Sequence, residues 1–245
     1  MKESIKNIDV APYQEFAREK LGFDFNDISL LVTALTHRSY VNEHRATVRA
    51  HNERLEFLGD AVLELVTSDF LYRNYDEPEG VMTALRSALV RTESIGDSGY
   101  ALGYEPLVRL SHGEKKGLER AHDVIMADCF EAVIGAIYLD QGYDVAKDFI
   151  YKHIIVKIDE IIEEGTWRDA KSYVQELAQK LDGATPVYHT LHEEGPDHDK
   201  MFQVGIFVND KMVAMGAGHS KQDAQTEAAR EAVKVYKKRQ KNTKK

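Results

Sequence analysis

The sequence contains little material for covalent cross-links and none for crossing a membrane. Its 245 residues include one cysteine, Cys129, so no disulfide can form within the chain, as is typical of a reducing compartment. No stretch approaches the roughly 18 uncharged apolar residues of a membrane span. The first twenty residues alternate charged and apolar positions and lack the apolar run of a secretory signal. We therefore expect a cytoplasmic protein with no membrane partner.

The composition excludes a wholly disordered chain. Hydrophobic residues make up 43% of the sequence and charged residues 30%, which is enough apolar material for a core. At roughly 100–200 residues per domain, the length predicts one large domain or two smaller ones. Acidic residues outnumber basic ones by 41 to 32, for a net charge of -9. The net charge alone therefore argues against a polyanionic ligand.

Residues 1–163 have the pattern of an all-α domain. Apolar residues recur three and four positions apart, and no convincing alternating run interrupts them. Examples are Leu55, Leu58, Val62 and Leu65 in one segment and Ile125, Cys129, Ala132 and Ala136 in another. Turn-forming residues at 76–80, 111–117 and 141–144 are expected to separate the helices.

The pattern changes at residues 164–168, which we interpret as a linker. Beyond them, residues 169–238 predict an α+β module of one helix, three antiparallel strands and a last helix. Asp169 is the expected N-cap of the first helix. Asn209-Asp210 is a hairpin turn signal, and the last helix is expected to begin near Ser220. The strand before the turn alternates apolar residues at Phe202, Val204, Ile206 and Val208.

Charge is distributed unevenly between the two parts. Residues 1–169 carry a net charge of -12, whereas residues 170–245 carry +3. The last nine residues (KKRQKNTKK) hold six cations, and we treat 239–245 as a basic tail. Such asymmetry is a reason to consider a nucleic acid. Taken alone, the tail is more typical of a solvated chain end than of a nucleic-acid contact.

Two sets of carboxylates stand out in the helical part. Glu53, Glu56 and Asp60 are three and four residues apart, so they share one helical face. Asp128 and Glu131 lie one turn apart in IMADCFEAVIGAIYL. The first set is also typical of a solvated acidic face. The second is harder to explain in that way, because its helix is too apolar for a surface and buried carboxylates are costly unless paired or metal-bound.

Two glycines suggest that the two sets meet. Gly59 precedes Asp60, and Gly135 follows Glu131 by one turn. A glycine inside a helix costs roughly 1 kcal/mol relative to alanine, and it is tolerated where another backbone comes close. Four carboxylates brought together would repel one another. Mg²⁺, a hard cation that prefers oxygen ligands, is the natural neutraliser, and its bound water can be activated to attack a phosphodiester.

Other combinations of reactive residues in the sequence are weaker candidates for a catalytic site. His37 and Ser39 could form a nucleophile pair, but ALTHRSY (residues 34–40) is better interpreted as a helix with polar residues for local packing. Cys129 lacks a context that would activate a thiolate and is expected in the core. A phosphate-binding loop of the form GxxxxGK[ST] is absent.

HNERLEFLGD (residues 51–60) resembles the signature of the ribonuclease III family. ALTHRSY resembles the segment upstream of that signature, and ADCFEAVIGAIYLD (127–140) resembles the family's second acidic helix. The C-terminal module resembles a double-stranded-RNA-binding domain in DAKSYVQE (169–176), GPDH (195–198) and GAGHSKQDAQTEAA (216–229). The resemblance covers nearly the whole chain in order. It implies an all-α endonuclease domain followed by an α+β RNA-binding domain, as in the bacterial enzyme.

The resemblance implies roles for five acidic residues. Asp60 and Glu131 match positions that are essential for hydrolysis. Glu56, Asp128 and Glu131 match direct ligands of Mg²⁺, for which Mn²⁺ can substitute, and Asp60 matches a position that ligates the metal or holds the attacking water. Glu53 matches a position linked to substrate contact and the dimer interface.

The resemblance also implies a homodimer without a small-molecule cofactor, in which each centre cuts one strand of double-stranded RNA. The products would carry 5′ phosphates and short 3′ overhangs. The expected substrates are ribosomal RNA precursors and structured messenger RNAs.

By the same resemblance, five residues of the second domain are expected to contact RNA. Gln175 and Glu176 would lie at one minor groove and His198 at the next, because such modules read the shape of duplex RNA over about 16 base pairs. Ser220 and Lys221 would meet phosphate at a helix N-terminus.

The sequence departs from the family after Lys221, where Gln222 replaces the usual second lysine and Asp223 follows. This change removes a phosphate contact and adds a repelling charge, so we expect weaker or more tail-dependent RNA binding.

Two other functions remain open at this point. The chain could be a non-catalytic protein of the same fold that only binds duplex RNA, although the four intact carboxylates argue against it. It could also be a magnesium-dependent phosphohydrolase of small molecules, against which the RNA-binding module argues.

Overall fold

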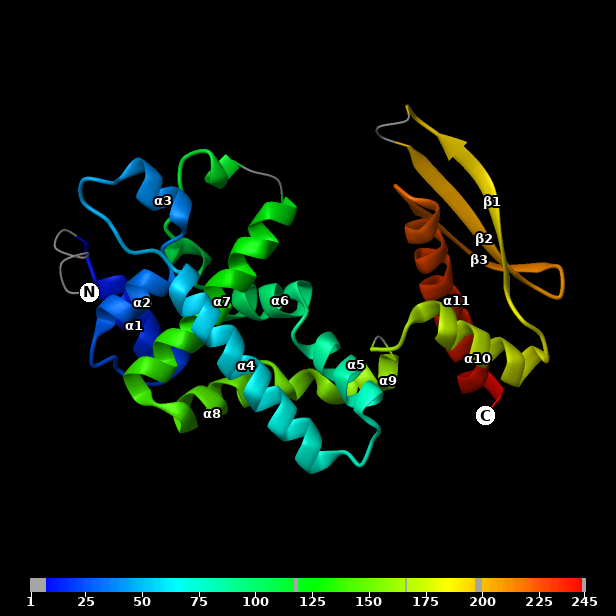
Figure 1. Cartoon of the computed structure of the whole chain (residues 1–245), viewed down its shortest axis with the longest axis horizontal. Helices are drawn as coiled ribbons and strands as arrows, with labels where there is room; N and C mark the ends of the chain where they lie inside the picture. Colours follow the sequence, from blue (N-terminus) through cyan, green and yellow to red (C-terminus); the bar gives the residue numbers. More distant parts are fainter. Residues whose placement is uncertain (1–7, 117–118, 166, 197–199, 244–245) are drawn as a thin grey trace. The chain divides into compact units, whose positions relative to one another are not determined.

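The computed structural model describes residues 8–116, 119–165, 167–196 and 200–243. The chain divides into two compact units, residues 1–167 and 168–245 (Figure 1). In the part that the structure describes, no helix is long and apolar enough to cross a membrane.

The first unit is built from helices. Its α-helices are α1 (Ala11–Phe16), α2 (Ile28–Ala34), α3 (Arg38–Glu43), α4 (Glu53–Asn74), α5 (Glu79–Leu89), α6 (Thr92–Leu102), α7 (Glu119–Gln141), α8 (Tyr143–His153) and α9 (Ile158–Glu164). Short helical turns are η2 (Ala17–Leu21), η3 (Glu105–Leu107), η4 (Glu114–Lys116) and η5 (Ile155–Lys157). The one β-bridge among its described residues joins Thr36 and Arg109. The prediction of an all-α first domain is confirmed.

Helix α7 forms the centre of this unit, where α4 packs across it (Figure 1). Every residue from Ile125 to Ile137 is buried except Asp128 and Glu131, which are half-buried. The prediction that this helix is too apolar for the surface is therefore confirmed. Cys129 is fully buried, and burial raises the pKa of its thiol to about 12, as expected for a core residue.

The buried face of α4 differs in part from the expected one. Leu55 and Val62 are buried as expected, but Leu58 is only half-buried, and Leu65, which fits the same apolar spacing, is 57% exposed. The buried face instead continues through Leu63 and Val66. The spacing of three and four residues fits more than one face over a 22-residue helix, because an α-helix turns every 3.6 residues.

The second unit packs two helices on a three-stranded antiparallel sheet. Its elements are α10 (Ala170–Asp182), β1 (Val187–Glu194), β2 (Met201–Val208), β3 (Lys211–Gly218) and α11 (Lys221–Thr243), with the strands in the order β1-β2-β3. Asn209 and Asp210 have φ angles of 49° and 60°, as a two-residue hairpin turn requires. Asp169 caps α10 by accepting a hydrogen bond from the Ser172 N–H at 2.8 Å. The predicted α+β module is confirmed.

The core of the second unit lies between the sheet and the helices. Val204, Ile206 and Val208 are buried, as the alternation predicts, whereas Phe202 is only half-buried. β3 runs from Lys211 to Gly218. At Gly216 a β-carbon would overlap the Ala228 backbone of α11, so glycine lets this helix lie directly on the strand.

Candidate functional site

Helices α4 and α7 approach each other at two glycines. A β-carbon at Gly59 would overlap the carbonyl oxygen of Glu131, and one at Gly135 would overlap that of Leu55. Because only glycine lacks a β-carbon, only glycine lets the two backbones come this close. The prediction that both glycines permit tight helix packing is confirmed. The approach places the backbone of Glu131 against the turn of α4 that carries Asp60.

Four predicted site carboxylates come from these two helices. Glu56 and Asp60 lie in the first two turns of α4, and Asp128 and Glu131 lie in the middle of α7. Asp60 is exposed and the other three are half-buried. The set therefore sits at the edge of the core, where solvent reaches it only partly.

Burial and mutual repulsion act on these carboxylates. Burial, followed by the charges of Asp60, Glu56 and Asp128, raises the pKa of Glu131 to about 8. The pKa of Glu56 is also raised, mainly by burial and then by Asp128. Burial raises the pKa of Asp128 as well, and the nearby His37 acts in the opposite direction. The four carboxylates are thus close enough for their charges to interact.

No basic side chain among the described residues forms an ion pair with this set. Within the described residues, none of the four side chains takes part in an ion pair or hydrogen bond. Other acidic residues on α4 do have basic partners. Glu53 lies 3.4 Å from Arg38 and 3.7 Å from His51. Glu64 lies 2.9 Å from Arg86. The uncompensated carboxylates are therefore the ones at the approach of α4 and α7.

The set is suited to a cation but is not arranged as a complete coordination shell. Among the residues that the structure describes, no three His, Cys, Asp or Glu side chains are gathered closely enough to hold a metal ion. The donors are all carboxylate oxygens, which hard divalent cations prefer. Their uncompensated charge at a half-buried position would also favour a cation. The donor chemistry of the set therefore fits Mg²⁺ or Mn²⁺.

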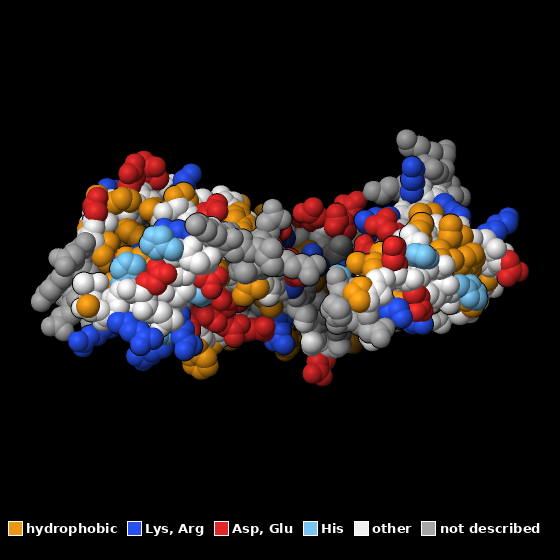
Figure 2. Space-filling model, turned by 90° about the horizontal axis from the view of Figure 1, so that it is seen from above, with side chains coloured by type: hydrophobic (Ala, Val, Ile, Leu, Met, Phe, Trp, Pro, Cys, Tyr) orange, Lys and Arg blue, Asp and Glu red, His pale blue; other side chains and the backbone are white. Residues whose placement is uncertain are grey.

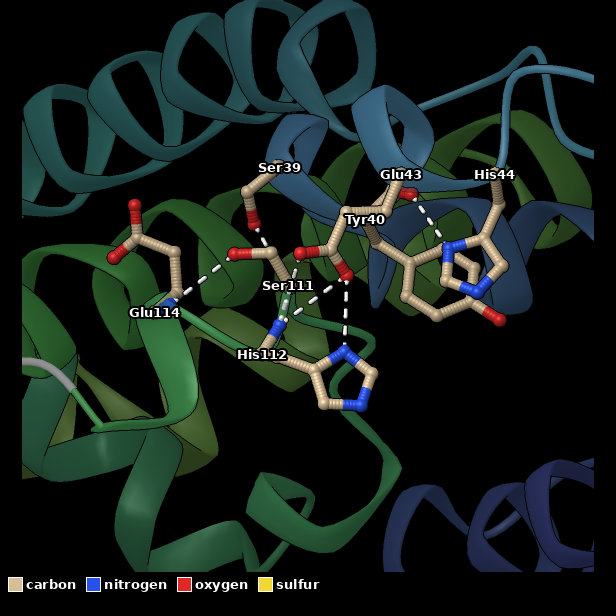
Figure 3. Close-up of polar contacts among 7 residues, drawn as sticks. All are labelled: Ser39, Tyr40, Glu43, His44, Ser111, His112 and Glu114. Atoms are coloured by element: carbon tan, nitrogen blue, oxygen red, sulfur yellow. Dashed lines mark hydrogen bonds and ion pairs between the residues drawn. The ribbon is translucent and has the colours of Figure 1, made fainter.

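Figure 3 shows how α3 is connected to the loop before α7. Ser39 Oγ accepts a hydrogen bond from the Ser111 N–H at 3.1 Å, and the Glu43 carboxylate accepts one from the His112 N–H at 3.2 Å. His37 caps α3 by accepting from the Ser39 N–H. These contacts support local packing by ALTHRSY, but the segment is not one helix as expected, because it joins the end of α2 to the start of α3 through Thr36, which forms a β-bridge. Sequence analysis did not find the pairing of Glu43 with His112, because the two residues are far apart in the chain.

In the second unit, two predicted RNA contacts lie on α10. Gln175 and Glu176 are both exposed. The Glu176 carboxylate lies 3.1 Å from the guanidinium of Arg168, a residue that sequence analysis did not single out. The side chain of Glu176 is therefore held by an ion pair at the start of the unit.

Two further predicted RNA contacts lie where α11 begins. Ser220 caps the helix, because its Oγ accepts from the Asp223 N–H at 3.0 Å and donates to the Asp223 carboxylate at 2.7 Å. Asp223, expected only as a repelling charge, thus also helps to start the helix. The ammonium group of Lys221 lies 2.6 Å from a carboxylate oxygen of Glu193. His198 lies outside the described residues.

The surface charges are grouped by sign. On the face of the first unit seen in Figure 2, Asp and Glu side chains gather in a patch separate from a group of Lys and Arg side chains. A negative net charge is therefore compatible with local contacts to a polyanion.

Two family models match the chain. Residues 27–158 match the model described as ribonuclease-III-like, and residues 170–236 match the double-stranded RNA binding motif. The two matches correspond to the helical unit and to the α+β unit.

Similar proteins cover most of the chain. The ribonuclease 3 of Protochlamydia amoebophila (strain UWE25) is 45% identical over 215 residues, which are 87% of this chain and 88% of that protein. The ribonuclease 3 of Streptococcus gordonii is 43% identical over 216 residues, covering 87% and 92%. Among solved structures, the nuclease domain of ribonuclease III from Campylobacter jejuni is 35% identical with a TM-score of 0.52, covering 57% of this chain and 94% of that one.

Proposed function

Because this chain belongs to the ribonuclease III family of double-stranded-RNA-specific endoribonucleases, we propose that Glu56, Asp60, Asp128 and Glu131 form its hydrolytic centre. Processing of ribosomal and messenger RNA is typical of the family. The observation that carries the assignment is the uncompensated carboxylate set at the approach of α4 and α7, where Glu131 has a pKa of about 8.

We assign the four carboxylates to a divalent cation, Mg²⁺ or its substitute Mn²⁺. Glu56, Asp128 and Glu131 would hold it, and Asp60 would ligate it or orient the attacking water. When bound, such a cation polarises the phosphodiester and makes its bound water acidic. Glu131 retains a proton near neutral pH in the absence of the cation, because its pKa lies above 7. A bound cation would take the place of this proton at Glu131, so cation binding would strengthen as the pH rises towards 8.

The second unit would bind the duplex RNA substrate. Duplex RNA shows its 2′-hydroxyls and phosphates in a regular pattern, and modules of this kind read that shape. We assign Gln175 and Glu176 to a minor groove and Ser220 and Lys221 to phosphate. Support comes from the exposure of Gln175 and from the position of Lys221 at the start of the 23-residue helix α11, where N–H groups and the helix dipole favour anions. The assignment of His198 to the second minor groove remains a prediction from the sequence.

We further propose a homodimer that forms through α4. Phe57, Leu65 and Tyr72 on this helix are 80%, 57% and 78% exposed, and exposed apolar side chains of this size on one element are typical of an interface. A region involved in dimer formation has been described for the Campylobacter jejuni nuclease domain. Glu53 lies one turn before Phe57, so we place it at the edge of this interface, beside the substrate.

The direct test of this function is incubation with long duplex RNA, with and without Mg²⁺, followed by analysis of the product ends. We expect Mg²⁺-dependent cuts in both strands that leave 5′ phosphates and short 3′ overhangs. Duplex binding without cleavage at any Mg²⁺ or Mn²⁺ concentration would instead identify a non-catalytic RNA-binding protein.

A further inference from the structure

Three charged residues meet between the end of β1 and the start of α11. The Lys221 ammonium group lies 2.6 Å from one carboxylate oxygen of Glu193, and the Lys200 ammonium group lies 3.4 Å from the other. Both ammonium groups also lie over the ring of Phe202, at 5.5 and 5.8 Å from its centre. One carboxylate thus connects two lysines above a shared aromatic ring. We call this arrangement of Glu193, Lys200 and Lys221 the Glu193 bridge.

The fold positions this bridge through a β-bulge. The pairing of β1 with β2 shifts between residues 190 and 192, after which Glu193 pairs with Phe202. Cross-strand partners share a face of the sheet, and Phe202 shares its face with Val204, which is buried in the core. Glu193 therefore returns to the helix side of the sheet, where Lys221 begins α11.

The Glu193 bridge is charged in the free protein and accessible to a ligand. Hydrogen bonding to Lys221 is the largest cause of a lowered pKa for Glu193, so the carboxylate is charged at neutral pH. The side chains of Glu193 and Lys200 are each 34% exposed and that of Lys221 is 56% exposed. Exposed ion pairs are individually weak, so an arriving phosphate can displace the carboxylate.

We propose that Glu193 competes with RNA phosphate for Lys221 and Lys200, and thereby sets the affinity of the second unit for duplex RNA and its dependence on salt. This inference rests on the proposed role of Lys221 as a phosphate contact. A phosphate seated on Lys221 would lie beside the Glu193 carboxylate, and the two anions repel each other. The carboxylate must therefore leave both lysines when RNA binds.

The competition has a specific salt signature. Each phosphate that a lysine neutralises releases a counterion from the RNA, which makes binding weaken as salt increases. A carboxylate that loses its lysine partners takes up a cation again and offsets part of that release. Removing the charge of Glu193 is therefore expected to make the plot of log affinity against log salt steeper by about one.

The experiment uses the full chain with EDTA, so that a duplex of about 20 base pairs is bound and not cut. Affinity is measured from 50 to 300 mM KCl for the wild type, Glu193→Gln, Lys221→Gln and the double variant. Glu194→Gln is the matched control, because it removes the same charge from the next residue, whose recorded ion pair is with His192. Circular dichroism confirms that each variant is folded.

We expect Glu193→Gln to bind roughly threefold to tenfold more tightly at the lowest salt, with most of the gain lost when Lys221→Gln is also present. Glu194→Gln should change affinity by less than about twofold. Equal or weaker binding by Glu193→Gln than by Glu194→Gln, with Lys221→Gln weakened, would overturn the competition alone. Unchanged binding by Lys221→Gln would overturn the phosphate role of Lys221 and the competition with it.

Discussion

The two units differ in whether the charged side chains of their proposed sites form ion pairs. Where α4 and α7 approach each other, the four carboxylates form no ion pair within the described residues, and burial and neighbouring charges raise the pKa of Glu131 to about 8. In the second unit, charged residues assigned to RNA are already paired, as Lys221 is with Glu193 and Glu176 is with Arg168.

This difference follows from burial. A charge that burial has partly removed from water gains strongly from an ion that neutralises it. Three of the four carboxylates of the first unit are half-buried, so a cation that neutralised them would stabilise them strongly. The charged side chains of the second unit are more exposed, and exposed ion pairs are weak. A lysine there can therefore leave its carboxylate partner and bind an RNA phosphate at little cost in free energy. The first arrangement is suited to chemistry and the second to reversible binding.

The largest expected effect is the loss of RNA cleavage without the loss of RNA binding in a single variant. Glu131→Gln removes a proposed metal ligand while preserving its shape. We expect cleavage of duplex RNA to fall by at least about a thousandfold, because the metal contributes several kcal/mol to the transition state. Binding of the same duplex in EDTA should stay within about twofold of the wild type, because the second unit is unchanged.

Glu15→Gln is the matched control, since it removes an exposed carboxylate from α1, outside the set. It should cleave at the wild-type rate. If Glu131→Gln lost RNA binding together with cleavage, the two functions would not belong to separate units. The carboxylate set would then be needed for folding.

The next effect concerns the helix approach that creates the uncompensated set. Gly59→Ala and Gly135→Ala each add a β-carbon where backbone atoms already lie. We expect each to lower the free energy of unfolding by about 1–3 kcal/mol or more, which corresponds to roughly 2–4 °C in Tm per kcal/mol. Thermal unfolding followed by circular dichroism measures this loss.

Gly80→Ala provides the comparison, because a β-carbon at Gly80 would meet nothing within 4 Å. It should be neutral or stabilising by up to about 1 kcal/mol, since alanine favours a helix more than glycine does. Equal Tm values for all three variants would show that the two helices do not depend on their glycines.

The smallest effect is a pH dependence that belongs to the first unit. The pKa of Glu131 is raised from an ordinary 4.5 to about 8, so between these values the folded chain binds a proton that the unfolded chain lacks. Without metal, this group therefore makes the free energy of unfolding fall as the pH rises through that window. Glu131→Gln lacks the group, so its Tm relative to that of the wild type should rise between pH 5.5 and 8.5.

Adding Mg²⁺ should reduce this difference at pH 8.5, because the cation stabilises only the wild-type set. A Tm difference that stays constant with pH would show that Glu131 titrates like an ordinary exposed carboxyl. The comparison between the two units would then lose its physical basis.

Local patterns in the sequence predicted much of this arrangement. The almost wholly apolar helix around Asp128 and Glu131 could only be a buried one, and Gly59 and Gly135 indicated a close approach of two backbones. Asn209-Asp210 predicted the hairpin because a two-residue turn needs positive φ angles, which these residue types tolerate. Each of these signals depends on residues that are adjacent in the chain or one helical turn apart.

Features that depend on the register of distant segments could not be predicted. The bulge in β1 places Glu193 beside Lys221, but neither the alternation of β1 nor the charge of Glu193 indicates where a bulge lies. Leu65 fitted the apolar spacing of α4 and is exposed, because spacing alone does not say which side of a long helix the rest of the domain covers. The sequence also predicted which carboxylates form the candidate site, but it did not indicate how deeply each of them is buried.

The most direct measurement of the central claim is calorimetric titration of the full chain with Mg²⁺ at pH 7 in two buffers of different ionisation enthalpy. The account predicts saturable binding that releases close to one proton per site, supplied by Glu131, and loss of that release in Glu131→Gln. Saturable binding that releases no proton, or equal binding by the variant, would contradict the claim that these four carboxylates form the cation site.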